Sequence, residues 1–72
     1  MMTLNNVEPG KEVSLVSISG GRGIISRLSS MGLVPGVKIT VLSRNGHGPV
    51  MISNKESRLA IGNGMAQKIS VV

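Results

Sequence analysis

The 72-residue sequence predicts a mainly β, single-domain protein, namely a small five-stranded barrel or sandwich with one short α-helix between the first and second strands. Three observations predict this fold class. Short segments with alternating apolar residues recur at close spacing, which is typical of half-buried strands. The ten glycines and three prolines fall mostly between those segments. Such a chain favours a closed sheet, because closure removes edges that so few residues could hardly cover.

The first strand is expected at about residues 12–18, after a short lead-in and a Pro9-Gly10 turn. Its apolar residues are Val13 and Leu15, followed by Val16 and Ile18, so the alternation slips by one residue. A β-bulge or a sharp bend would produce this slip, and bent strands are how small barrels turn corners.

A helix is expected next, at about residues 24–31. Ile24, Leu28 and Met31 fall at i, i+4 and i+7 and therefore share one helical face, which Ile25 widens. Gly32 follows the last apolar position, where a left-handed residue commonly ends a helix. We therefore expect the apolar stripe to face the core and the helix to stop at Gly32.

Four further strands follow, each introduced by a turn signal or a glycine break. Pro35-Gly36 predicts a type II turn, since proline presets φ and glycine accepts a positive φ. Asn45-Gly46, between two strand patterns, predicts a hairpin. A single helical turn is expected at about residues 65–67. The strands are expected at about residues 37–43, 50–54, 58–61 and 68–72.

Composition excludes several classes of protein. The absence of cysteine rules out disulfides and Cys-based metal sites, and it suits a reducing compartment. No apolar run approaches the roughly 20 residues that a membrane-spanning helix needs, and no signal peptide is recognisable. We therefore expect a cytoplasmic protein that does not insert into a membrane.

The net charge of +5 favours an acidic partner, although the basic residues are spread along the chain as they would be on an ordinary solvated surface. The absence of Phe, Tyr and Trp argues against an aromatic groove for proline-rich peptides and against base stacking on aromatic rings. A basic barrel that binds nucleic acid, of ribosomal or transcription-associated type, remains the alternative function.

Catalysis and metal binding are not expected. The acidic side chains are Glu8, Glu12 and Glu56, and His47 is the single histidine, so a nucleophile, its base and an orienting group can hardly be assembled. A ferrous site would need several converging histidines or carboxylates. No cofactor is expected, and His47 in its glycine-rich loop is read as a solvated side chain.

The segment from Arg27 to Gly36, with the sequence RLSSMGLVPG, resembles the signature R-L-x-x-[LM]-G-[LIF]-x-P-G of the FeoA family. Other blocks agree with it in the same order: Leu4, Pro9-Gly10, the SISGG segment at 17–21 and the AQKISV close at 66–71. One departure is the segment GNGM at 62–65, where the family often has an acidic helix. The match extends over essentially the whole chain.

The resemblance implies an SH3-like barrel with an inserted helix, as in the C-terminal domain of DtxR-type repressors. It also implies a non-catalytic cytosolic accessory of ferrous iron uptake. Its partner would be FeoB, a membrane transporter with a cytosolic GTPase domain, which could recruit the protein to the inner face of the membrane. Nucleic acid is not expected as a partner, and weak self-association is left open.

A partner-docking face is expected around the helix and the turn that follows it. Apolar residues rimmed by charge are a fair signal of an interface, and a wet helix surface is the ordinary alternative. Leu33 is expected to be exposed in the turn, so Leu33→Asp, like Arg27→Glu, should weaken binding at unchanged stability. Leu42 is expected to point outward, away from Ile39 and Val41. The residues expected to form this face are Arg22, Arg27, Met31, Leu33, Pro35 and Leu42.

Overall fold

Six strands, one nine-residue helix and two shorter helical segments form the fold of residues 2–72, which a computed structural model describes. All five predicted strands are present, and a sixth strand of two residues precedes them. The elements are β1 (Met2–Thr3), the 3-10 helix η1 (Leu4–Asn6), β2 (Glu12–Ile18), α1 (Arg22–Ser30), β3 (Lys38–Arg44), β4 (Val50–Asn54), β5 (Ser57–Ile61), α2 (Asn63–Ala66) and β6 (Ile69–Val71).

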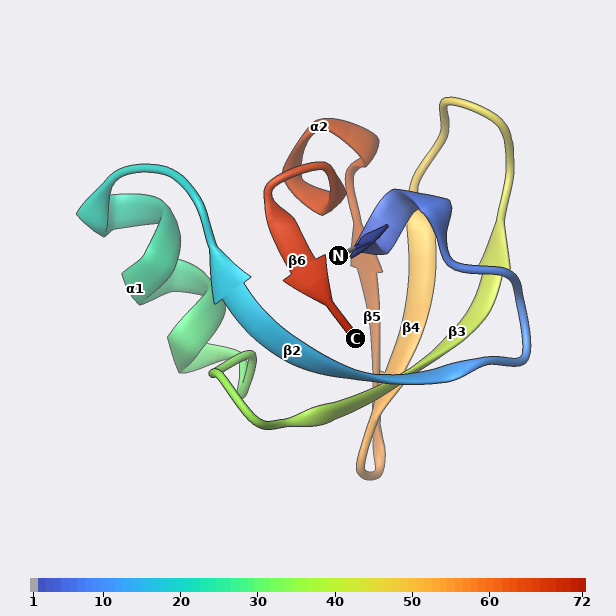
Figure 1. The fold of residues 1–72 in the computed structure, drawn as a ribbon, viewed down its shortest axis with the longest axis horizontal. Coiled ribbons are helices and arrows are strands. Elements are labelled where there is room, and N and C mark those ends of the chain that lie inside the picture. Colours follow the sequence, from blue (N-terminus) through green and yellow to red (C-terminus); the bar gives the residue numbers. More distant parts are fainter. Residues whose placement is uncertain (1) are drawn as a thin grey trace.

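The strands follow the order β1-β6-β2-β3-β4-β5, and every neighbouring pair is antiparallel. Strand β2 belongs to both halves of the sheet: its first residues pair with β3 and its last residues pair with β6. The register of β2 against β6 shifts between Leu15 and Ser17, which confirms the predicted irregularity. Because β2 bends there, the sheet curls around one core, with α1 beyond the end of β2 (Figure 1).

The predicted turns are also present. The amide of Val37 donates to the carbonyl of Val34 at 3.1 Å, and Gly36 has φ +93°, as a type II turn requires. Lys11 closes the earlier turn by donating to Glu8 at 3.2 Å. The hairpin at Asn45-Gly46 exists as well, with a loop of residues 45–49 between β3 and β4.

Helix α1 ends in a Schellman motif. Gly32 has φ +88°, its amide donates to the carbonyl of Ser29 at 2.9 Å, and the amide of Leu33 reaches back to the carbonyl of Leu28 at 3.0 Å. This motif brings the residue after the glycine onto the last turn of the helix. Leu33 is therefore buried, at 0% exposure, and the prediction that it is exposed is wrong.

The core lies between the two halves of the sheet and the helical segments, and α1 contributes less to it than its sequence suggested. Leu28 is buried and Ile24 is half-buried, but Ile25 is 40% exposed and Met31 is 37% exposed. Met31 departs from the helical face because α1 ends at Ser30. The buried core residues are Leu4, Val7, Leu15, Leu28, Leu33, Ile39, Val41, Val50, Ile52, Ile61, Ala66, Ile69 and Val71.

Within residues 2–72, no helix is both long enough and apolar enough to pass through a lipid bilayer.

Candidate partner-binding surface

The residues expected to form a docking face do not lie together. Arg22, Arg27 and Met31 are exposed on or beside α1 and Pro35 is exposed in the turn after it, whereas Leu33 is buried. Leu42 points outward as predicted, with 39% exposure, but it lies near the end of β3 that is remote from α1 (Figure 1). The structure therefore separates Leu42 from the other residues.

Three hollows surround α1 and the turn that follows it. The first, which we call the helix groove, lies between α1, β2 and the turn and has a volume of about 270 Å³. Two serines are its polar residues, and its walls are otherwise aliphatic, so it offers apolar contact more than hydrogen bonding. The helix groove is lined by Ser17, Ile18, Ile25, Ser29, Leu33, Val34 and Pro35.

The second hollow, the strand groove, lies on the other side of α1, against the end of β5 and α2. It is smaller, at about 180 Å³, and combines one cation with flexible thioether side chains. Methionine adapts to different apolar partners, because it is unbranched and polarisable. The strand groove is lined by Arg27, Leu28, Met31, Ala60, Ile61, Gly62 and Met65.

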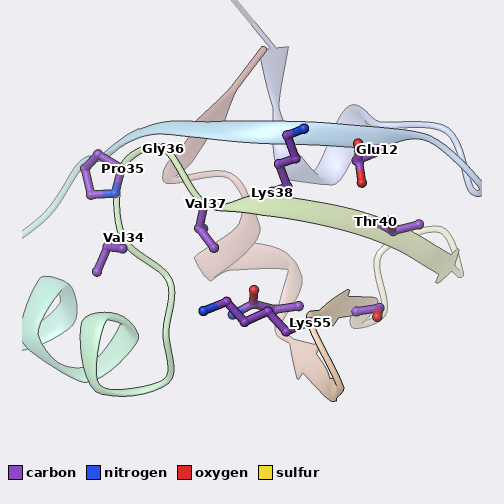
Figure 2. Close-up of a pocket in the computed structure, with 10 residues that line it drawn as sticks. Glu12, Val34, Pro35, Gly36, Val37, Lys38, Thr40 and Lys55 are labelled. Carbon is purple, nitrogen blue, oxygen red and sulfur yellow. The ribbon is translucent and has the colours of Figure 1, made fainter.

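The third hollow, the lysine groove, is a wide depression of about 710 Å³ between the turn and the β4–β5 hairpin. Figure 2 shows Val34 and Val37 at its α1 side and Lys55 across from Val37. Lys38 and Lys55 form no ion pair within residues 2–72, although Glu12 lines the same depression. The lysine groove is open and holds charges of both signs.

Asn54 supports the turn between these hollows. It is 6% exposed, and its Nδ2 donates to the carbonyl of Gly32 at 3.4 Å, a long hydrogen bond to the residue that ends α1. Its Oδ1 is buried and has no hydrogen-bond partner among residues 2–72. Asn54 thus ties the β4–β5 hairpin to the end of the helix and helps to position Leu33 and Val34.

Ile25 and Val34 are exposed apolar residues beside α1 that the sequence did not single out as surface residues. They are 40% and 41% exposed and both line the helix groove. A signal was present for Ile25, because it lies about 100° around the helix from Ile24 and therefore at the margin of the apolar stripe. Val34 carried no comparable signal, since its exposure depends on how the turn packs.

Among the described residues, no three His, Cys, Asp or Glu side chains gather closely enough to hold a metal ion. His47 is exposed in the β3–β4 loop. The ion pair found in residues 2–72, between Arg44 Nη2 and Glu8 Oε1 at 3.4 Å, joins that loop region to the N-terminal segment, where Arg44 also donates to the carbonyl of Asn5 at 3.1 Å.

Comparison with known proteins identifies relatives over the full described length. The family model for the FeoA domain matches residues 2–72. A protein of Methanocaldococcus jannaschii whose assigned name is Fe(2+) transport protein A is 46% identical over 71 residues, which cover 99% of this chain and 85% of that protein.

Solved structures of FeoA proteins are also similar to this chain. An iron uptake regulatory protein (FeoA) is 40% identical, with a TM-score of 0.91 over 97% of this chain and 93% of the other. FeoA of Stenotrophomonas maltophilia, solved with zinc and described as a prokaryotic SH3 domain protein, is 21% identical, with a TM-score of 0.85 over 100% of this chain and 91% of the other. The latter likeness shows the SH3-like fold alone.

Proposed function

The chain belongs to the FeoA family, an accessory of ferrous iron transport, and from this premise we propose that it is a non-catalytic module that binds and regulates a FeoB-type transporter. The partner surface would be the cytosolic GTPase region of that transporter. The protein would then act in the cytoplasm and be recruited to the inner face of the membrane by its partner.

The exposure of two apolar residues supports the helix groove as the docking site. Ile25 and Val34 are large aliphatic side chains, each about two-fifths exposed, that line the helix groove from α1 and from the turn. Exposed apolar side chains around a hollow are typical of protein–protein anchors, because a partner side chain that fills the hollow removes apolar surface from water on both sides.

Charge around the helix groove supports a protein partner with an acidic surface. Arg22 precedes Ile25 by three residues and therefore lies on the same side of α1. Arg27 is exposed on the other side of α1, where it lines the strand groove, and neither arginine forms an ion pair within residues 2–72. Complementary charge of this kind raises the rate of association and selects among partners.

The test is binding of the intact protein to the isolated cytosolic GTPase domain of the transporter, in GTP-bound and GDP-bound states, by calorimetry. Ile25→Asp and Val34→Asp should each weaken binding by about tenfold or more, since both place a charge inside an apolar contact. Because both side chains are already exposed, melting temperatures should stay close to that of the wild type.

Leu42→Asp is the matched control. Leu42 has nearly the same exposure, 39%, and receives the same change, but it lies at the remote end of β3. It should bind like the wild type. Loss of binding in Leu42→Asp together with normal binding in Ile25→Asp would move the docking site to that end. Binding to nucleic acid that falls steeply with salt, and no binding to the GTPase domain, would favour the alternative function.

A further inference from the structure

Strand β5 leaves one edge of the sheet open. All five of its residues pair with β4, and β5 stands last in the strand order. Within residues 2–72, no backbone hydrogen bond outside the regular elements involves residues 57–61. The opposite end of the sheet is the two-residue β1, so β5 is the longer of the two free edges.

The free edge presents specific backbone groups. Ser57 pairs with Asn54 across a two-residue loop, and the alternation of an antiparallel ladder then turns the amides and carbonyls of Arg58 and Ala60 away from β4. Both residues are exposed. Unpaired donors and acceptors in this geometry are a template for the backbone of one more strand.

The strand groove continues this edge. It lies where β5 ends, between Ala60 and the last turns of α1, and Met31 and Met65 line it. An added strand of five residues is about 17 Å long, so it would reach from the hairpin to this groove. One apolar side chain of that strand could enter the groove beside the two methionines.

The charges near the free edge of β5 favour an acidic strand as the added one. Lys55 and Arg58 are exposed at the hairpin end of β5, and Arg27 lines the groove at the other end, whereas Glu56 is the single acidic residue nearby. None of these four side chains forms an ion pair within residues 2–72. A second copy of the chain would bring another net charge of +5 to this edge, which disfavours self-pairing.

We propose that the free edge of β5 binds an extended, acidic segment of a partner protein by β-strand addition, with one apolar side chain of the segment in the strand groove. This site is separate from the helix groove, on the other side of α1. It does not depend on the identity of the transporter, and its test uses neither the transporter nor a nucleotide.

The probe is a synthetic six-residue peptide of alternating Glu and Val, with blocked ends, titrated into the isotope-labelled protein. We expect saturable amide shifts along residues 57–61 and slowed hydrogen exchange at Arg58 and Ala60. A peptide of alternating Lys and Val should not bind. The double variant Lys55→Glu/Arg58→Glu should weaken binding of the Glu peptide by about tenfold or more, since like charges then face each other.

Lys11→Glu/Lys68→Glu is the matched control, because it changes the net charge equally at two other exposed lysines. It should bind the peptide within about twofold of the wild type. Ile25→Asp should also bind normally, which separates this site from the proposed docking site. Three results would each overturn the proposal. The two double variants could lose peptide affinity equally, or the amide shifts could be confined to the helix groove. The third is protection of residues 57–61 from hydrogen exchange by self-association alone.

Discussion

At the residue scale, the burial of Leu33 fixes the turn after α1 to the core. It is fully buried and packs under the end of the helix, so Leu33→Asp would place a carboxylate in the core. We expect the free energy of unfolding to fall by more than about 4 kcal/mol, comparable with the stability of a whole small domain, because the buried residues of the described chain are apolar apart from Asn54 and would leave the charge unpaired. Chemical denaturation followed by circular dichroism measures this. Leu33→Met should lose less than about 1.5 kcal/mol. A stable Leu33→Asp variant would mean that the side chain can leave the core.

The same residue marks the limit of what the sequence could predict at this scale. Gly32, Gly36 and the outward Leu42 follow from turn chemistry and strand alternation, and all three lie as predicted. Leu33 does not follow, because a residue after a helix is buried or exposed according to where the left-handed turn sends the chain. A Schellman motif typically has apolar residues on both sides of its glycine, as Leu28 and Leu33 are around Gly32. This pattern was the available sequence signal that Leu33 is buried.

At the scale of the element, the end of α1 requires glycine at position 32 for two separable reasons, the positive φ and the close approach of Asn54. A side chain at Gly32 must adopt φ +88°, and its Cβ would lie 2.8 Å from Nδ2 of Asn54. Gly36 has a similar φ, +93°, but a Cβ added there would meet no atom of the described residues within 4 Å beyond its two chain neighbours. Gly36→Ala should therefore cost about 1–2 kcal/mol from conformation alone, and Gly32→Ala at least about 1 kcal/mol more.

A double-mutant cycle decides whether Asn54 causes the difference. Asn54→Ala removes the close contact and the bond to the carbonyl of Gly32. In that background, Gly32→Ala should cost about as much as Gly36→Ala does in the wild type. Denaturant midpoints of the four proteins supply the cycle. An unchanged cost in the Asn54→Ala background would show that conformation, and not the Asn54 contact, accounts for the effect.

The elements themselves were largely predictable, and the exceptions share a cause. Strand β2 has the predicted bounds, and its bulge lies where the alternation slips. Strand β1 was missed because it has only two residues and exists through pairing with β6, almost seventy residues away in sequence. The proposed docking face was similarly only partly predictable: the helix groove combines residues from β2, α1 and the turn, and no local sequence pattern joins them.

At the scale of the whole molecule, the positive charge is mostly uncompensated. The net charge is +5, and within residues 2–72 one ion pair, Arg44–Glu8, is present. Mutual repulsion of exposed cations opposes the compact state and is screened by salt. We therefore expect the melting temperature to rise by about 2–5 °C between 10 mM and 300 mM sodium chloride, measured by calorimetry at neutral pH.

The variant Lys11→Glu/Lys68→Glu tests the cause, because each change removes two units and the net charge falls from +5 to +1 (5 − 4 = 1). Its melting temperature should be higher at low salt and should respond less to added salt. If added salt raised the melting temperature of both proteins equally, repulsion between exposed cations would not be the cause of the rise. A confirmed difference would mean that the chain carries its excess charge at the expense of stability.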